Sequence, residues 1–454
     1  MHDTIAAIAT PNAAGGIGIV RISGSKAIEV ADAVFKAKNE LNLSQLQGYR
    51  ATYGMIMDEQ SAVDEAIALI FRAPKSYTGE DIVEFSCHGG LFVMQKVLRV
   101  ILEHGARPAQ AGEFTKRAFL NGRIGLTEAE SVMNIIGAHG EQAASAALNS
   151  LEGTLSKKIE KITQVFLSAA AHMSAWVDYP DEEIEQLDLS SLLAEYKNAR
   201  ADLFGLFSKF DAGQAITQGV ETVIVGRPNV GKSTLMNMLL GTERSIVTSY
   251  AGTTRDIIEE TVRIGNVVLR LADTAGIRNS DDPVESIGID RAKQKLERSG
   301  LVIAVFDASQ PLIDEDFELL ELCKNRNSIA VINKTDIKTV YDEQVILPYV
   351  NQCVFISAAN NEGYDDLAKA IETVLGTQEI DTSAAMLATE RQRDCCKRAL
   401  ECVDEAIFAI ESGMTMDAIN VSTDGAIEAL LEMTGQKASE AVVAKVFENF
   451  CVGK

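Results

Sequence analysis

The first part of the chain alternates between apolar and polar residues, a pattern typical of strands with one buried face. The alternation covers residues 18–22, 66–71 and 82–86, and turn-rich segments separate these runs. Residues 92–103 instead place apolar side chains at helical spacing. The pattern therefore predicts a compact α+β domain over residues 1–120.

The pattern then changes to long helical segments, which a Pro-containing acidic turn interrupts near residues 178–181. Helical periodicity returns late in the chain, at residues 384–411, 425–434 and 437–450. Because the two ends of a domain often lie close together, a second domain can be inserted into it. We therefore expect a discontinuous all-α domain with another domain inserted. The expected boundaries are 121–216 and 377–454 for the all-α domain and 217–376 for the inserted domain.

A glycine-rich motif opens the inserted domain. Residues 226–233 read GRPNVGKS and lie between an apolar strand-like run and a helix-like run. This is the setting of a phosphate-binding loop. Gly226 and Gly231 allow the backbone to turn its N–H groups towards phosphates, and the following helix N-terminus favours anions. Lys232 can reach the β- and γ-phosphates, and the Ser233 hydroxyl can bind Mg²⁺.

Four further elements follow in the order that a nucleotide-hydrolysing domain requires. A switch-like segment contains Thr254, whose side chain can close over the γ-phosphate and complete the Mg²⁺ shell. A strand-like run at 267–272 ends in DTAG, in which Asp273 would hold the metal and the Gly276 amide would sense the γ-phosphate. Two more strand-like runs end in NKTD at 333–336 and in SAA at 357–359. The inserted domain is therefore predicted to be a doubly wound, Ras-like α/β domain.

Asp336 predicts which nucleotide binds. Its carboxylate can accept hydrogen bonds from N1–H and from the exocyclic amine of guanine, and adenine offers neither arrangement. The wrong base would leave a buried charge unpaired. The sequence therefore predicts GTP as the nucleotide.

The residue after DTAG indicates how hydrolysis must differ from that of Ras-like proteins. A Gln orients the attacking water there in those proteins, whereas this chain has Ile277, which cannot form a hydrogen bond. A nearby acidic residue could take this role, Glu285 being one of three along with Asp281 and Asp282. The Asn229 side chain could bind a monovalent cation that replaces an arginine finger. The alternative, with Asn229 as a loop stabiliser and Glu285 on the solvated surface, stays open at this stage.

Charge and cysteine usage limit the partners and the compartment. The formal net charge is −23, so the chain repels phosphate backbones at long range, and a basic partner is expected to hold any RNA. The basic groups near 157–161 and 391–398 are interpreted as solvated helix faces. Seven cysteines occur without a CxxC pair, which favours a reducing cytosol. The most apolar window, 166–177, is too short to span a bilayer, and no signal segment is recognised at the N-terminus.

Three weaker motifs lie outside the inserted domain. The glycines at 15–18 fail the dinucleotide fingerprint because Arg21 occupies the third glycine position, so they are interpreted as a turn into a strand. The sequence at 88–90, HGG, is similar to an oxyanion loop, yet there is no G-x-S-x-G to accompany it. The C-terminal FCVGK contains Cys451 and Lys454, and we expect this tail to be tethered near the helical domain.

Together these segments resemble the MnmE (TrmE) family of tRNA modification GTPases. The resemblance rests on GGIGIVRISG, SYTGEDIVEFSCHGG, GEFTKRAFLNGRIGLTEAE, the inserted nucleotide domain and the terminal FCVGK. It implies an N-terminal folate-binding and dimer-forming α+β domain, a discontinuous helical domain and a K⁺-stimulated GTPase domain. It also implies the full set of GTP contacts, which are Asn229, Val230, Gly231, Lys232, Ser233, Thr234, Thr248, Ser249, Tyr250, Ala251, Gly252, Thr253, Thr254, Asp273, Thr274, Ala275, Gly276, Asn333, Lys334, Thr335, Asp336, Ser357, Ala358 and Ala359.

The resemblance further implies metal, folate and catalytic residues. Ser233 and Thr254 would bind Mg²⁺, Glu285 would orient the attacking water, and Cys451 matches a terminal cysteine of the family. The implied K⁺ ligands are Asn229, Thr248, Tyr250 (through its backbone) and Thr253, and the implied folate-binding residues are Arg21, Glu84, Arg123 and Lys454. Basic groups suit the carboxylates of folate, and Glu84 can accept from the pterin N–H groups.

The activity implied by the resemblance is addition of an aminomethyl-type group to carbon 5 of the wobble uridine in certain tRNAs. Methylene-tetrahydrofolate would supply the carbon, and the FAD-using partner MnmG would take part. Two other hypotheses remain. One is a GTP-dependent switch in ribosome assembly, which would be expected to have a basic RNA-binding module. The other is a hydrolase that uses His88 or Cys451, for which no partner residues are evident.

Overall fold

The computed structural model describes residues 3–138, 140–178, 188–241, 260–265, 267–271, 299–337, 340, 343–378, 380–448 and 450–453. The chain forms two compact units. The first consists of residues 1–133, 159–171 and 420–454, and the second of residues 134–158 and 172–419.

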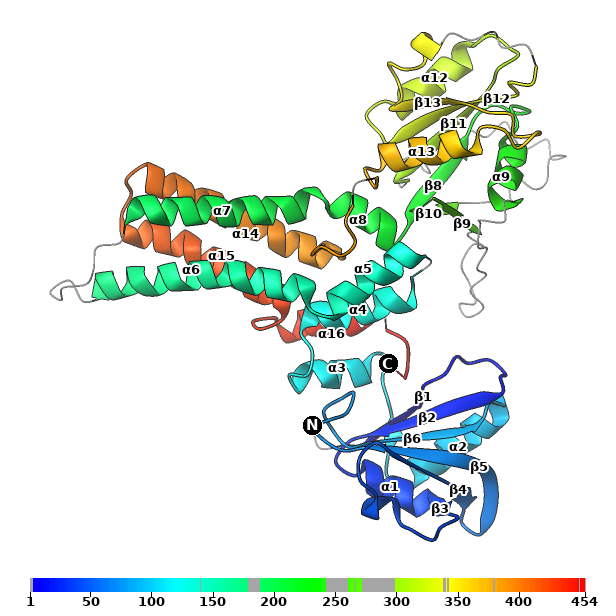
Figure 1. Cartoon of the computed structure of the whole chain (residues 1–454), viewed down its shortest axis with the longest axis vertical. Coiled ribbons are helices and arrows are strands. Elements are labelled where there is room, and N and C mark those ends of the chain that lie inside the picture. Colours follow the sequence, from blue (N-terminus) through cyan, green and yellow to red (C-terminus); the bar gives the residue numbers. More distant parts are fainter. Residues whose placement is uncertain are drawn as a thin grey trace. The chain divides into compact units, whose positions relative to one another are not determined.

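The first unit is built on a seven-stranded sheet with the strand order β3-β4-β5-β6-β2-β1-β7. Neighbouring strands are antiparallel except for the parallel pair of β1 and β7. The strands are β1 (Ile5–Ile8), β2 (Ile17–Ser23), β3 (Phe35–Ala37), β4 (Arg50–Asp58), β5 (Ser61–Phe71), β6 (Ile82–His88) and β7 (Arg107–Pro108). This sheet, with its helices, confirms the predicted α+β class (Figure 1).

Two helices, α1 (Ala27–Val34) and α2 (Leu91–Glu103), bury one face of this sheet. The alternation along β5 shows why: Ala66 and Ala68 pack in the core, whereas Ile67 between them is 48% exposed on the opposite face. Tyr53 on β4 and Ile17 on β2 are also exposed, at 39% and 69%. The sheet therefore presents apolar side chains on a face that α1 and α2 do not cover.

The C-terminal tail packs against α3 (Glu113–Leu120) and strand β1 in the first unit. Helix α16 (Glu440–Glu448) packs on α3, with the rings of Phe447 and Phe119 6.5 Å apart. Val452 then forms a β-bridge with Ala111, and a Cβ atom on Gly453 would lie 2.4 Å from the carbonyl oxygen of β1 residue Ile8. The tail is thus tethered, as expected, beside α16 of the predicted helical part, where the rings of Phe450 and Phe447 lie 5.0 Å apart. Its contacts with strand β1 and with the segment before α3 were not predicted.

The second unit contains a six-stranded sheet with the order β13-β12-β11-β8-β10-β9, in which only β9 is antiparallel. Its strands are β8 (Val220–Val225), β9 (Glu260–Ile264), β10 (Val267–Leu271), β11 (Leu301–Asp307), β12 (Ser328–Asn333) and β13 (Gln352–Phe355). Every residue of β11 and β12 is buried, as expected for parallel strands that are covered on both faces.

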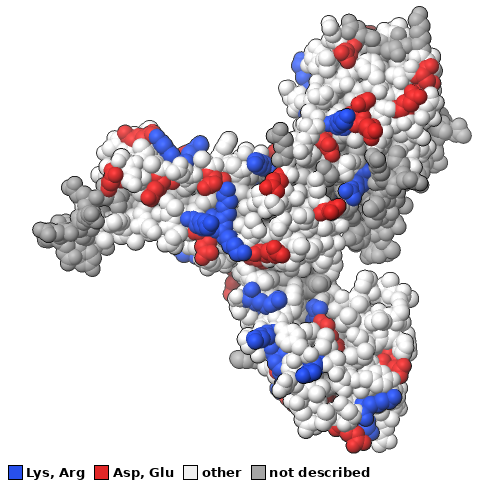
Figure 2. All heavy atoms as spheres, in the orientation of Figure 1, with Lys and Arg blue, Asp and Glu red and all other residues white. Residues whose placement is uncertain are grey.

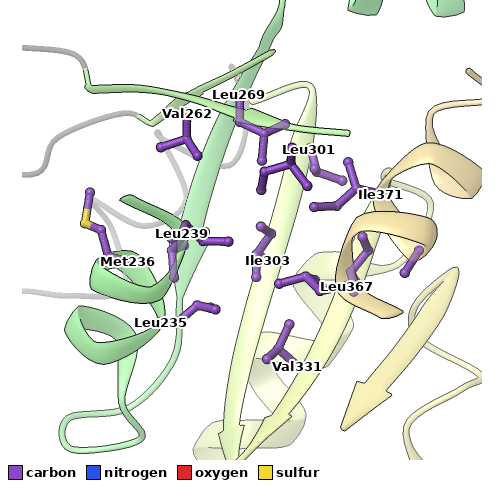
Figure 3. Packing of buried hydrophobic residues seen from close by; sticks show 14 of the residues in the cluster. Leu235, Met236, Leu239, Val262, Leu269, Leu301, Ile303, Val331, Leu367 and Ile371 are labelled. Atoms are coloured by element: carbon purple, nitrogen blue, oxygen red, sulfur yellow. The ribbon is translucent and has the colours of Figure 1, made fainter. Parts of the chain in front are cut away.

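Helices cover both faces of this sheet. On one face, α9 (Lys232–Gly241) and α13 (Tyr364–Val374) pack Leu239 and Ile371 around Ile303 of β11 (Figure 3). On the other, α12 (Asp314–Cys323) packs Leu320 against Phe306. The doubly wound α/β fold predicted for the inserted domain is therefore confirmed.

Helices from both sides of the inserted domain pack together in the second unit. Helix α7 (Leu189–Ser208) precedes the domain and α14 (Glu390–Glu411) follows it, and the two lie side by side (Figure 1). Arg200 of α7 forms an ion pair with Asp404 of α14, and the Cys396 thiol lies 3.5 Å from the Leu203 carbonyl oxygen. These contacts confirm a discontinuous all-α part, while the exact domain boundaries stay predictions.

The remaining helices are α4 (Leu126–Ile136), α5 (Glu141–Leu151), α6 (Thr154–Asp178), α8 (Phe210–Thr217) and α15 (Met416–Thr434), with 3-10 turns η1 (Leu43–Gln45) and η3 (Glu343–Val345). Helix α6 ends at the predicted acidic turn. No described helix is long and apolar enough to cross a membrane.

The basic groups singled out in the sequence pair with acidic neighbours. Lys158 lies 2.9 Å from Asp202, and Arg398 lies 3.0 Å from Asp394 in the preceding turn of α14. On the face drawn in Figure 2, Lys and Arg are interspersed with Asp and Glu over the described residues. This agrees with their interpretation as solvated helix faces.

Candidate functional site

The phosphate-binding loop leaves the carboxyl end of β8, at the centre of the six-stranded sheet. Strand order reverses there, with β10 on one side and β11 on the other, which is where ligands bind in doubly wound folds. Both loop glycines have positive φ angles, +148° at Gly226 and +100° at Gly231. A Cβ atom would lie 2.4 Å from the Val305 carbonyl oxygen at the first and 2.2 Å from Asn333 Nδ2 at the second. Only glycine fits both positions.

The charged side chains of the loop hold its shape. Lys232 Nζ donates to the carbonyl oxygens of Gly226 and Arg227, at 2.9 and 2.8 Å. Arg227 itself is anchored by Asp316 of α12, whose carboxylate lies 2.8 Å from its Nε. The Ser233 side chain, in the first turn of α9, belongs to an exposed residue. A cation at the loop and an accessible hydroxyl are the groups needed to bind phosphates and Mg²⁺.

Asn333 connects the phosphate-binding loop to the two segments predicted to bind the base. Its Nδ2 donates to the Val230 carbonyl oxygen at 3.0 Å, and its Oδ1 accepts from the Ala358 N–H at 3.0 Å. The Thr335 N–H donates to the Ile356 carbonyl oxygen at 3.2 Å. Three segments that are far apart in the sequence thus form one site at the carboxyl edge of the sheet.

Asp336, the residue predicted to recognise guanine, is held on one side by Ser357. The buried Ser357 hydroxyl donates to its Oδ1 at 2.7 Å, while Asp336 itself is exposed. The Ser357 backbone is fixed in turn by a two-way pairing with Glu362. One carboxylate oxygen is therefore held, and the group remains accessible to the N–H donors of guanine.

Lys334 makes a contact that the sequence did not indicate. Its Nζ donates to the Asn229 carbonyl oxygen at 2.7 Å and to Asp307 Oδ2 at 2.6 Å. Burial acts to raise the pKa of Asp307, but hydrogen bonds from Lys334 and Ser309 outweigh it and hold the pKa below its ordinary value. The signal was an acidic residue at the carboxyl end of an apolar strand, where sites of this fold lie.

The other half of the predicted GTP and metal site lies outside the described residues. This half comprises Thr248, Ser249, Tyr250, Ala251, Gly252, Thr253, Thr254, Asp273, Thr274, Ala275, Gly276 and Glu285. Among the predicted metal ligands, Asn229 and Ser233 are described. Asn229 has a φ of +67°, the left-handed conformation that Asn tolerates better than most residues.

Three of the four predicted folate-binding residues come together in the first unit. Arg21 on β2 and Glu84 on β6 are paired in register, with Nε and Oε1 2.7 Å apart. The Arg21 guanidinium lies 5.5 Å from the Tyr77 ring centroid and 5.4 Å from that of Phe114. Arg123 donates to the Tyr77 carbonyl oxygen at 2.9 Å and lies 5.2 Å from its ring.

The fourth, Lys454, lies outside the described residues, but the carbonyl oxygen of the preceding Gly453 accepts from Arg21 at 3.2 Å. The sequence did not indicate Tyr77 or Phe114 as neighbours of Arg21. Tyr77 belongs to the SYTGED segment that supported the family resemblance, but nothing in its spacing indicated an aromatic ring beside Arg21.

His88 and Cys451 do not meet in a hydrolase-like arrangement in the described hydrogen bonds. His88 Nδ1 lies 2.7 Å from Asp64 Oδ1, and this hydrogen bond raises the pKa of the imidazole. Cys451 is exposed, and its carbonyl oxygen accepts from the Gly112 N–H at 3.3 Å. The hydrolase hypothesis therefore gains no support from these contacts.

Comparisons with known proteins cover the whole chain. A family model described as the MnmE helical domain matches residues 126–451, and one described as the GTP-binding protein TrmE N-terminus matches residues 4–123. The chain is 41% identical over 457 residues to the tRNA modification GTPase MnmE of Clostridioides difficile (strain 630), covering 100% of both. It is 43% identical over 454 residues to that of Lactococcus lactis subsp. lactis (strain IL1403), covering 100% of this chain and 98% of the relative. Among solved structures, Aquifex aeolicus Era bound to GDP and aluminium fluoride aligns with 40% of this chain and 66% of its own at 26% identity, with a TM-score of 0.24.

Proposed function

The chain belongs to the MnmE family of tRNA modification GTPases, and on that basis we propose that it couples K⁺-stimulated GTP hydrolysis to modification of the wobble uridine of certain tRNAs. GTP hydrolysis in tRNA modification is the activity of the family. The observation that carries the proposal is the joining of the phosphate-binding loop to the base-binding segments through Asn333 and Lys334. A hydrolysis assay with GTP and ATP tests it: GTP should be turned over and ATP should not, and equal turnover would contradict the assignment.

The proposed metal chemistry uses both described and undescribed residues. Ser233 and Thr254 would hold Mg²⁺, and Asn229, Thr248, Tyr250 and Thr253 would hold K⁺. The bound K⁺ would supply positive charge where the terminal phosphoryl group leaves, the role of an arginine finger in other GTPases. Support comes from Ile277, which cannot orient water, and from Asn229, which lies in the phosphate-binding loop in a left-handed conformation.

The K⁺ and Glu285 proposals can be tested separately. Replacing KCl by NaCl should depress GTP turnover sharply, and an unchanged rate would refute the cation proposal. Glu285→Ala should leave GTP binding intact and slow hydrolysis, because the water loses its orienting carboxylate. Asp282→Ala is the matched control, expected to hydrolyse GTP at nearly the normal rate. Loss of GTP binding in Glu285→Ala would mean that the residue has another role.

We further propose that the cluster of Arg21, Glu84 and Arg123 around Tyr77, completed by Lys454, binds 5,10-methylene-tetrahydrofolate. The chemistry of the cluster fits: guanidinium groups suit the folate carboxylates, the Glu84 carboxylate can accept pterin N–H groups, and Tyr77 offers an aromatic face. Calorimetry with tetrahydrofolate should show binding that Arg123→Ala weakens. Arg72→Ala is the control, because Arg72 pairs with Asp81, 3.6 Å away, and not with the cluster. Absence of binding would favour the hypothesis of a ribosome-assembly switch.

A homodimer is proposed on the uncovered face of the seven-stranded sheet. Ile17, Tyr53 and Ile67 are exposed there, and a second copy would bury them and also enclose the folate cluster on the same face. Light scattering should report a dimer, and Ile67→Glu should produce monomers. Phe408→Glu is the control, since it changes a 63% exposed apolar side chain on α14. A dimer that is unaffected by Ile67→Glu would place the interface elsewhere.

The partner and the compartment follow from charge and thiols. With a net charge of −23, tRNA binding is proposed to rely on a basic partner, the FAD-using MnmG. None of the seven cysteines, all of which the structure describes, forms a disulfide, and we propose a reducing cytoplasm as the compartment. The group added to carbon 5 would be aminomethyl or carboxymethylaminomethyl. We propose that Cys451 takes part in the modification reaction, because this residue is exposed. Mass spectrometry of wobble nucleosides from cells lacking this gene should show loss of that group, and unmodified profiles would contradict the proposal.

A further inference from the structure

Asp307 is the last residue of β11, and Lys334 links it to the phosphate-binding loop. We propose that it is a positioning residue for GTP binding, which holds the Lys334 ammonium against the Asn229 carbonyl oxygen and thereby fixes the phosphate-binding loop. Asp307 belongs to none of the nucleotide-binding motifs in the sequence. The inference depends on nucleotide binding alone and is independent of the proposed K⁺, folate and tRNA chemistry.

The Asp307 carboxylate is fully engaged and cannot contact the nucleotide itself. The residue is 2% exposed. Its Oδ1 accepts from the Ser309 N–H at 2.9 Å and from the Ser309 hydroxyl at 2.6 Å, and its Oδ2 accepts from Lys334 Nζ at 2.6 Å. Each oxygen therefore has a partner, and the carboxylate is locked in one orientation. Its influence on the ligand must pass through Lys334.

Lys334 transmits this orientation to the phosphate-binding loop. Its Nζ makes a second hydrogen bond, at 2.7 Å, to the Asn229 carbonyl oxygen. Lys334 and Asn229 both have left-handed backbones, with φ of +68° and +67°. Non-glycine residues hold this conformation only where surrounding contacts determine it. A single ammonium group thus links two strained residues, and Asp307 fixes the position of that group.

A negative charge is needed at this position because two ammonium groups bind the same loop. Lys232 donates to the Gly226 and Arg227 carbonyl oxygens, while Lys334 donates to Asn229. Carbonyl oxygens are neutral and do not compensate two cations. The Asp307 carboxylate neutralises Lys334, so the ammonium stays at the loop rather than turning to solvent. The charge of Asp307, and not only its hydrogen bonds, is therefore expected to matter.

A double-mutant cycle in the full-length protein separates positioning from general stability. The measurement is the affinity for GDP, read from titration with a fluorescent GDP analogue. Asp307→Asn should weaken binding by about tenfold to hundredfold, because a hydrogen-bonded charge is lost from a buried pair. In a Lys334→Ala background the same substitution should change the affinity by less than about twofold, since its only route to the nucleotide is gone. Asp404→Asn, which removes the carboxylate paired with Arg200, is the control and should bind GDP normally.

Two outcomes would overturn the proposal. One is an unchanged GDP affinity in Asp307→Asn, and the other is an equal loss with and without Lys334, which would mean that Asp307 acts through stability. If Asp307→Asn does not fold, Ser309→Ala provides the test, because it removes the hydroxyl donor to Oδ1 and leaves the carboxylate charged and held on that side by the Ser309 N–H alone. Ser309→Ala should weaken GDP binding by a few-fold only when Lys334 is present, and an affinity unchanged in that variant would then overturn the proposal.

Discussion

Replacing Asn333 by alanine should uncouple the phosphate-binding loop from the base-binding segments. The Asn333 side chain forms hydrogen bonds with the Val230 carbonyl oxygen and the Ala358 N–H. All three residues are buried, with exposed fractions of 2% for Asn333, 3% for Val230 and 4% for Ala358. Each hydrogen bond contributes about 1 kcal/mol, and the truncation leaves two buried polar groups without partners. The local free energy of opening should therefore fall by roughly 2–4 kcal/mol.

Hydrogen–deuterium exchange measures this loss directly. A fall of that size corresponds to roughly 30-fold to 1000-fold faster exchange in the opened segments. The faster exchange should appear in peptides over 226–234 and 354–360. Asn351→Ala is the matched control: its Oδ1 accepts from the Ser328 N–H at 2.8 Å, at the opposite end of β12, so both peptides should exchange normally. Unchanged exchange in Asn333→Ala would refute the idea that this side chain holds the two segments together.

Three further predictions concern the first unit. Cys451 is exposed, whereas burial raises the pKa of the Cys87 thiol to about 11. Iodoacetamide should therefore label Cys451 before Cys87 in the native protein. Mass spectrometry gives the order of labelling, and early labelling of Cys87 would contradict its burial. Gly453→Ala should weaken tetrahydrofolate binding but not GTP hydrolysis, because the new Cβ atom would lie 2.4 Å from a β1 carbonyl oxygen; calorimetry and a GTPase assay test this, and unaltered folate binding would contradict it. Burial raises the pKa of Glu113, but a hydrogen bond from Arg107 and its other contacts lower it below its ordinary value of 4.5. The ionised carboxylate therefore stabilises the fold above pH 4.5, and this contribution is lost as the pH falls below that value. On acidification the melting temperature of Glu113→Gln should fall by less than that of the unaltered protein, and an equal fall in both would contradict this account.

The fold followed from periodicity because the apolar patterns were long and unambiguous. Residues 328–332 had to form a covered strand, and the structure places them in β12, with every residue buried. The alternation at 66–71 likewise predicted the half-buried β5, although the strand begins earlier, at Ser61. Helix starts were less accurate: α14 begins at Glu390 rather than near 384, since Thr389 caps it by accepting from the Gln392 N–H.

The sequence predicted motif residues of the site better than the residues that support them. Lys232, Asn333 and Asp336 were found because the phosphate and guanine chemistry requires those side chains at that spacing. Asp307 escaped notice because its role depends on the pairing of β11 with β12, which places it opposite Asn333 in register. Its place at the carboxyl end of an apolar strand pointed to the site, but its contact with Lys334 at the end of the neighbouring strand has no local sequence signal, so only the three-dimensional arrangement reveals that contact.

The base preference of Asp336→Asn tests the nucleotide assignment most directly. An amide at this position can donate to the carbonyl group at carbon 2 of xanthine, whereas it loses the carboxylate that accepts from the guanine amine. Competition between GTP and XTP for the full-length protein should therefore show a preference for GTP in the unaltered chain. In Asp336→Asn the preference should move towards XTP by about a hundredfold or more. An unchanged preference for GTP in that variant would contradict the account.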